Sequence, residues 1–190
     1  MKRAAWREQV SGIDVGRLVF VDESGIWAGM KPRYGRAPGR RRVVDEMTRK
    51  HRRNLSVIGA VRATGVGETL VIEEAVDTDV FDTYVTECLG PTLQEGDIVV
   101  LDNLRVHHAS DIKRVASERK ATVMWLPSYS PDFNPIERLW SKMKALIRAA
   151  KATTRDELDV ALKRALEAVS QKDIAGWFTH SGYPLEVADN

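Results

Sequence analysis

Residues 97–126 read DIVVLDNLRVHHASDIKRVASERKATVMWL, and this stretch decides the fold. Residues 97–103 form a continuous apolar run of the kind found in strands that are buried on both faces. Residues 109–120 have the spacing of an amphipathic helix, and residues 122–126 form a second short apolar run. A strand, a helix and a strand in this order predict a parallel βαβ unit with a right-handed crossover. The chain is therefore expected to be an α/β protein.

The flanking sequence predicts a mixed sheet followed by helices. Strand patterns cover residues 17–23, 25–30, 55–62 and 69–73, and helical spacing covers 79–89. The clearest helix is predicted at 135–151, with further helices at 154–169 and 173–178. Residues 32–53 are rich in proline, glycine and arginine and are expected to form a long exposed loop.

Composition excludes several classes of protein. With 190 residues, 43% of them hydrophobic and 29% charged, the chain is expected to be one globular domain, residues 1–190. Cys88 is the only cysteine, which excludes an intramolecular disulfide and a multi-cysteine zinc site. No apolar run approaches the ~20 residues of a membrane span, and the N-terminal MKRAAWREQV lacks the apolar core of a secretory signal. We expect a cytoplasmic protein without a membrane partner.

The charge is unevenly distributed. The formal net charge is only +2, but residues 31–53 carry ten Lys and Arg against Asp45 and Glu46, so this window is +8 and the rest is −6. Such asymmetry indicates a segment that binds a polyanion. Its candidate DNA-binding residues are Arg33, Arg36, Arg40, Arg41 and Arg42. Tyr34 is a candidate for stacking on a base. The five tryptophans, Trp140 among them, are expected to serve packing.

Two aspartates occur at unusual places. Aspartate is depleted in strands, yet Asp22 ends the apolar run LVFVD and Asp102 ends IVVLD. Carboxylates at neighbouring strand ends would repel each other, and a divalent cation such as Mg²⁺ would remove that cost. The alternative is that each aspartate begins a turn or caps the next element. Glu23 is an alternative to Asp22 as the carboxylate that binds the cation. Strand alternation puts the two side chains on opposite faces of the sheet, and the sequence pattern does not show which face carries the site.

A third carboxylate, Glu137, lies where a loop meets a helix. In SPDFNPIERLW, Asn134 suits the N-cap, Pro135 the first helical position and Glu137 the third. Asn134 and Glu137 are therefore expected to form a capping box on local grounds. The functional alternative is that Glu137 joins Asp102, whose strand neighbours the strand that precedes this loop.

These places together carry a family resemblance. The motifs VFVDESG (19–25), VVLDNLRVHH (99–108) and LPSYSPDFNPIERLW (126–140) resemble the DDE catalytic domain of IS630-type bacterial transposases, relatives of the Tc1/mariner group. Thirty-four residues separate Asp102 from Glu137, as in the D-34-E arrangement of that group. The resemblance covers residues 17–183, including WAGMKPRYGRAPG (27–39) and GWFTHSGY (176–183).

The resemblance implies a ribonuclease H-like fold, with a five-stranded mixed sheet flanked by helices. It implies that Asp22, rather than Glu23, joins Asp102 and Glu137 as catalytic residues and ligands of two Mg²⁺ or Mn²⁺ ions. Asn103, His107, Asn134 and Pro135 would support this site. His107 matches a family position from which it would contact DNA or the surroundings of the metal, whereas a histidine at a loop–helix junction is ordinarily on the surface.

The implied activity is phosphodiester hydrolysis at transposon ends followed by strand transfer into target DNA, by a homodimer on DNA in a bacterial cytoplasm. The helix-turn-helix region that precedes this domain in relatives is absent from the sequence, so a separately encoded part is expected to supply it. Two alternatives remain: a catalytically silent remnant that only binds DNA or a partner, and a ribonuclease H-like nuclease or resolvase.

Overall fold

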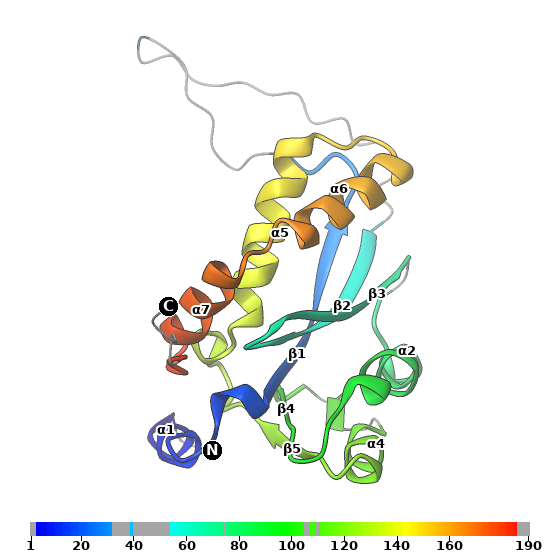
Figure 1. Ribbon diagram of the computed structural model, residues 1–190. Coiled ribbons are helices and arrows are strands. Elements are labelled where there is room, and N and C mark those ends of the chain that lie inside the picture. The colour runs from blue at the N-terminus through cyan, green and yellow to red at the C-terminus, as the bar shows by residue number, and fades with distance from the viewer. Residues whose placement is uncertain are drawn as a thin grey trace.

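The computed structural model describes residues 3–31, 39, 54–73, 75–104, 107–108 and 111–185 (Figure 1). The strands are β1 (Leu18–Trp27), β2 (Asn54–Arg62), β3 (Gly65–Ile72), β4 (Ile98–Leu101) and β5 (Thr122–Trp125). The α-helices are α1 (Arg3–Val10), α2 (Thr78–Thr83), α4 (Ile112–Glu118), α5 (Ile136–Ala150), α6 (Arg155–Glu167) and α7 (Gln171–His180). The π-helical turn η2 (Tyr84–Leu89) continues α2, and short 3₁₀ turns lie at η1 (Val15–Arg17), η3 (Gly90–Thr92) and η4 (Pro131–Phe133).

The strands form one five-stranded sheet in the order β3-β2-β1-β4-β5. β1 pairs antiparallel with β2, and β2 with β3, whereas β4 lies parallel to both β1 and β5. The predicted βαβ unit is therefore present as β4, α4 and β5. This mixed sheet confirms the ribonuclease H-like architecture that the resemblance implied.

β1 corrects one expectation. The separate strand predicted at residues 25–30 does not form, because β1 runs without a break from Leu18 to Trp27. Its ladder with β2 pairs Gly25 with Ser56 and continues to the pair of Trp27 with Asn54. Pairing along the whole of β2 thus overrides the local preference of glycine to interrupt a strand.

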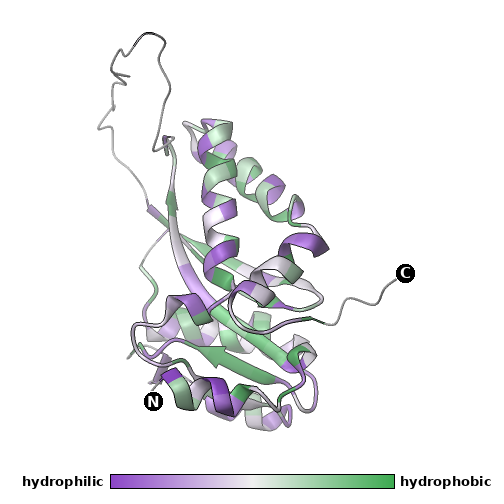
Figure 2. Ribbon diagram, turned by 90° about the vertical axis from the view of Figure 1, so that its left-hand side faces the viewer, coloured by the Kyte–Doolittle hydropathy of each residue, from purple (hydrophilic) through white to green (hydrophobic). Residues whose placement is uncertain are grey.

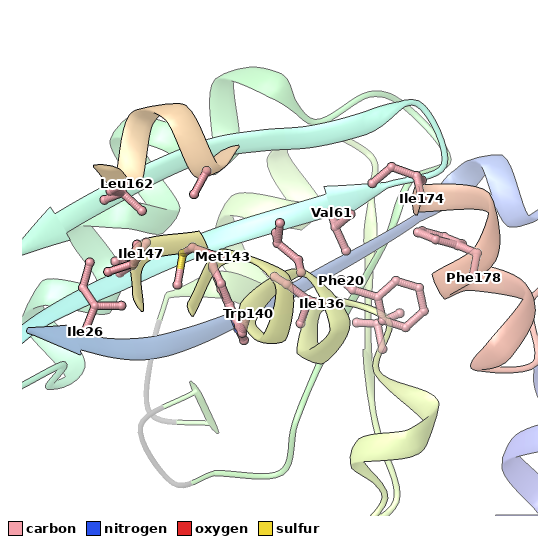
Figure 3. Packing of buried hydrophobic residues seen from close by; sticks show 14 of the residues in the cluster. Phe20, Ile26, Val61, Ile136, Trp140, Met143, Ile147, Leu162, Ile174 and Phe178 are labelled. Atoms are coloured by element: carbon pink, nitrogen blue, oxygen red, sulfur yellow. The ribbon is translucent and has the colours of Figure 1, made fainter. Parts of the chain in front are cut away.

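Helices α5, α6 and α7 cover one face of the sheet, together with Trp6 of α1 (Figures 1 and 3). Strand side chains at alternate positions, such as Phe20 and Val61, point into this layer. They meet a stripe along α5 that includes Ile136, Trp140, Met143 and Ile147. This packing fixes α5, and with it Glu137, against β1.

The opposite face is covered by α2, η2 and α4. Figure 2 shows strands that are largely hydrophobic and helices that carry both hydrophobic and hydrophilic residues. Val19 and Val21 of β1 point to this second layer, where they meet Phe81 and Tyr84. The sheet thus has a core on each side, and its central strands β1 and β4 contribute buried residues to both. Within the part of the chain that the structure describes, none of the helices has the length and apolar character needed to cross a membrane.

Candidate active site

Asp22 lies in the interior of β1, on the face of the sheet that α5 covers. It follows Phe20 in the strand alternation, and only 7% of it is exposed. The indole Nε1 of Trp140 in α5 donates a hydrogen bond to Asp22 Oδ2 at 3.2 Å. β1 and α5 therefore hold this carboxylate from two sides.

The surroundings of Asp22 are strongly electronegative. Burial raises the pKa of its carboxyl from the ordinary 3.8 to about 8, and the charges of Glu23, Glu137 and Asp102 add to the rise. Such a shift is expected where acidic side chains converge without a cation to balance them.

Asp102 reaches the same place from the neighbouring strand. The parallel register pairs Leu18 with Ile98 and Phe20 with Val100, and its continuation by two residues puts Asp22 level with Asp102. β4 ends at Leu101, so Asp102 is the first residue beyond the strand, with a side chain that is 37% exposed. The sheet opens at this point because β1 continues while β4 stops.

Glu137 comes from the first turn of α5, and the expected capping box around it does not form. Pro135 occupies the N-cap, and no side chain caps the helix there. Asn134 Oδ1 is buried and has no hydrogen-bond partner, so it does not cap the helix either. Pro135 displaces Asn134 from the cap by one position, which leaves the exposed Glu137 side chain free to face the neighbouring strands.

Asp22, Asp102 and Glu137 converge on one cleft of about 370 Å³. Its walls are formed by the middle of β1, the end of β4, the loop after β5 and the start of α5. The lining residues are Asp22, Asp102, Asn103, Leu104, Leu126, Pro127, Ser128, Tyr129, Ser130, Pro131, Asn134 and Glu137. The three predicted catalytic carboxylates and the supporting Asn103 and Asn134 thus lie around a common space.

The donor set fits a divalent cation of the Mg²⁺ type. In the described residues, no three or more His, Cys, Asp or Glu side chains are already close enough to hold an ion. The cleft nevertheless offers three carboxylates, and the unpartnered Asn134 Oδ1 adds an amide oxygen to its lining. Oxygen ligands of this kind suit Mg²⁺ and Mn²⁺, which complete their coordination with water and phosphate.

His107 is buried, which corrects the expectation of a surface histidine. Its Nδ1 lies 2.8 Å from Asp102 Oδ1 and its Nε2 lies 3.2 Å from Glu23 Oε2. Burial lowers the pKa of the imidazole, but the interactions with Asp102 and Glu23 outweigh it and raise the pKa to about 10. These contacts favour the imidazolium form of His107, whose charge would balance that of Glu23, the carboxylate that β1 directs away from the cleft.

The two acidic residues of β1 lie in different surroundings. Asp22 lines the cleft, whereas Glu23 points to the other face and meets His107 there. Asn103, the other residue of the Asp-Asn pair, donates from Nδ2 to Ser128 Oγ at 3.2 Å and so connects the end of β4 with the loop after β5. Sequence reasoning did not identify the Glu23–His107 pair, although strand alternation had already put Glu23 opposite Asp22.

Tyr129 is a further residue at the cleft that the sequence analysis did not single out. It is 100% exposed, lines the cleft and adopts a left-handed backbone conformation with φ of 57°. A non-glycine residue in this conformation carries strain, and a fully exposed aromatic ring is unusual on a protein surface. The sequence feature that could have identified Tyr129 is its place in SYSPD, between Pro127 and Pro131.

The predicted DNA-binding residues lie outside the described part of the chain. They are Arg33, Arg36, Arg40, Arg41 and Arg42, and Tyr34 lies outside it as well. Their segment connects β1 with β2, the two strands that bring Asp22 to the cleft.

Comparison with known families identifies a match over most of the chain. Residues 17–159 match the family described as DDE superfamily endonuclease. The Tc1 transposase of Caenorhabditis elegans is 24% identical over 120 residues, which cover 61% of this chain and 44% of the relative. The chain thus spans less than half the length of this relative.

The fold is also similar to solved structures of the Mos1 transposase. A Mos1 paired-end complex with the left transposon end superposes with a TM-score of 0.75 at 17% identity, over 95% of this chain and 56% of the other. A mariner Mos1 paired-end complex with Mg superposes with a TM-score of 0.69 at 15% identity, over 96% and 61% of the two chains. At this level of identity the likeness shows the fold.

Proposed function

The chain belongs to the DDE superfamily endonucleases, and on this basis we propose that it is the catalytic domain of a transposase that cuts DNA at transposon ends and joins the freed ends to target DNA. The observation that carries the proposal is the convergence of Asp22, Asp102 and Glu137 on one cleft, from three elements that are far apart in the sequence. Acidic side chains gathered in this way destabilise a protein without a cation, so their presence favours a metal-dependent reaction.

Asp22, Asp102 and Glu137 would hold two Mg²⁺ or Mn²⁺ ions. Mos1 has been solved in paired-end complexes with each of these metals. Bound in the cleft, the ions would activate the attacking water or 3′-hydroxyl and stabilise the leaving oxygen. Asp22 would lose its proton on binding, because a nearby cation reverses the shift that the other carboxylates cause.

The residues around the triad would hold it in place. His107 would fix the orientation of Asp102 through its Nδ1, since its Nε2 is occupied by Glu23. Asn134 would direct its unpartnered Oδ1 to an ion or to water in the cleft. The exposed Glu137 and Asp102 leave one side of the cleft open, and a phosphodiester would enter from there.

DNA would be bound by the basic segment and by the rim of the cleft. The net charge of +8 over residues 31–53 suits contacts of Arg33, Arg36 and Arg40–Arg42 with phosphates, which position DNA without reading its sequence. Tyr129 would stack on an unpaired base at the rim. Neutralising Arg40, Arg41 and Arg42 should weaken binding and reduce the slope of log affinity against log salt, and an unchanged slope would argue against this segment.

Recognition of the transposon ends would fall to a helix-turn-helix part outside these 190 residues, and the working assembly would be a dimer on DNA. A protein with this substrate would work in the bacterial cytoplasm, at the nucleoid. Sedimentation of the protein with and without end DNA would test for the dimer.

The proposal is tested by cleavage of DNA in the presence of Mn²⁺ by the wild type and by Asp102→Asn. A matched control is Asp159→Asn, which changes an exposed carboxylate of α6 that does not line the cleft. We expect Asp102→Asn to abolish cleavage and Asp159→Asn to retain it, with both variants folded. Cleavage by Asp102→Asn would overturn the assignment. A wild type that binds DNA but never cleaves it would favour the silent remnant.

A further inference from the structure

The side chain of Trp140 donates a hydrogen bond to the carboxylate of Asp22. It lies three positions after Glu137 in α5, so both residues face β1 from the same side of the helix. Trp140 is 2% exposed and packs between α5 and the sheet (Figure 3). Its Nε1 is 3.2 Å from Asp22 Oδ2.

An indole is an unusually restrictive partner for a carboxylate. Its N–H can donate but not accept, so it always meets an acceptor oxygen of Asp22. Its ring is held by the apolar core between helix and sheet, whereas a water molecule at the same place could exchange or turn. Oδ2 of Asp22 therefore accepts the hydrogen bond from the indole, and the other carboxylate oxygen, Oδ1, does not.

The sheet provides the space that the indole occupies. Gly59 of β2 is paired with Asp22 in the β1–β2 ladder. A Cβ at residue 59 would lie 3.1 Å from Trp140 Cη2 and 3.1 Å from Thr69 Cγ2, which is tighter than ordinary contact. A side chain at this position would therefore press on the ring that holds Asp22. The position of the Asp22 carboxylate in β1 thus depends on the indole of Trp140 in α5, and the position of that indole depends on the small size of Gly59 in β2.

We propose that Trp140 is a positioning residue of the metal site: its indole N–H engages Oδ2 of Asp22 so that Oδ1 is presented to a divalent cation, and Gly59 keeps the space for the ring. The inference rests on the proposed function, since it takes Asp22 as a metal ligand. Groups that hydrogen-bond metal ligands commonly change metal affinity by about 10–100-fold when they are removed.

The test measures Mn²⁺ binding in the absence of DNA, from the electron paramagnetic resonance signal of the free ion. Trp140→Phe removes the donor and keeps an aromatic ring in the core. The matched control is Trp6→Phe, because Trp6 is also fully buried and its Nε1 donates to Tyr183 Oη at 3.0 Å, away from the cleft. We expect Trp140→Phe to raise the Kd for Mn²⁺ by about tenfold or more, and Trp6→Phe to leave it within twofold of the wild type. Equal Kd values for Trp140→Phe and the wild type, or equal losses in both variants, would overturn the inference.

A second pair of variants keeps the test decisive if Trp140→Phe does not fold. Gly59→Ala retains the indole but displaces it, whereas Gly67→Ala adds a methyl group on β3 that meets Ala60 Cβ at 3.3 Å and not Trp140. Only Gly59→Ala should weaken Mn²⁺ binding, and wild-type binding by it would contradict the inference. Asp102→Asn separates the two levels of the argument. If it binds Mn²⁺ like the wild type, the proposed metal site itself is wrong; if it loses binding while Trp140→Phe and Gly59→Ala do not, only the role of Trp140 is wrong.

Discussion

Asp22→Asn should make the metal-free protein more stable, although it destroys the proposed active site. A carboxyl with a pKa raised to about 8 in the folded protein is protonated there at pH 7, whereas in the unfolded chain, with a pKa near 3.8, it is ionised. Folding at pH 7 therefore requires this carboxyl to bind a proton about three pH units above its pKa in the unfolded chain. Each unit costs about 1.4 kcal/mol, so the penalty on the free energy of folding is on the order of 4 kcal/mol. Asparagine is never ionised and avoids this penalty, while its Oδ1 can still accept from Trp140.

The sign of the pH dependence follows from the raised pKa. The penalty is absent below pH 3.8, grows as the pH rises and is complete above about pH 8. Urea unfolding with EDTA should therefore show Asp22→Asn and the wild type converging near pH 4 and diverging toward pH 8. Saturating Mn²⁺ should stabilise only the wild type, because only its folded state would bind the ion.

The matched control is Asp97→Asn. Asp97 is also buried, at 2% exposure, but its Oδ2 pairs with Arg62 Nη1 at 2.7 Å and accepts from the backbone N–H of Gln94. Removing one partner of such a buried pair destabilises a protein by about 3–5 kcal/mol, so this substitution should act in the opposite direction. If Asp22→Asn were no more stable than the wild type at pH 7 in EDTA, the electrostatic argument for the cleft would be refuted.

Three further predictions concern the surroundings of the site and the helices that support it. Replacing His107 by leucine should lower the free energy of unfolding by about 3–5 kcal/mol at pH 7, measured in urea, because Asp102 and Glu23 lose the cation that they share. The pKa of the imidazole is raised from 6.5 to about 10, so this stabilisation is complete below pH 6.5. The difference in stability from the wild type should therefore vanish above pH 10. Tyr129→Ala should weaken single-stranded DNA binding by about tenfold in fluorescence anisotropy without lowering Tm, and unchanged affinity would count against stacking. Thr154→Ala, which removes the capping box of α6, should cost about 1 kcal/mol, and an unchanged unfolding midpoint would contradict the cap's role.

The sheet could be predicted from the sequence because its central strands are buried on both faces. Val99, Val100 and Leu101 are fully buried and feed two separate cores, so their run of apolar residues was unambiguous. The extent of β1 could not be predicted in this way. Gly25 favours a break locally, and only pairing with Ser56 of β2, 31 positions later in the chain, overrides it.

The convergence of the carboxylates could be predicted in part. The sequence predicts that Asp22 and Asp102 end neighbouring strands; parallel pairing of β1 and β4 does bring the two level, but only Asp102 follows a strand end, because β1 continues past Asp22. Only the family resemblance assigns Glu137 to the active site, because the residues around it match the sequence pattern of a capping box. What decides against the cap is a shift of one residue, with Pro135 rather than Asn134 at the helix start. Single-residue boundaries of this type depend on the packing of the whole helix.

The roles of Trp140 and His107 could not be predicted because each depends on tertiary contacts. Trp140 belongs to the apolar stripe of α5 and was assigned to packing, which is correct for its ring but omits its N–H. His107 follows a strand end in a polar stretch, and only the depth at which it meets Phe81, with ring centroids 4.5 Å apart, shows that it is buried. Side chains with an apolar body and one polar atom often combine both functions.

The strand that carries Asp22 and the strand paired with it also flank the basic segment in the sequence. From Asp22, β1 continues to Trp27 in an unbroken ladder with β2, and the chain between these strands carries the charge of residues 31–53. Five strand residues span roughly 17 Å, about half a helical turn of duplex DNA. A stretch of paired strand of this length therefore separates Asp22 from the end of β1 that leads into residues 31–53.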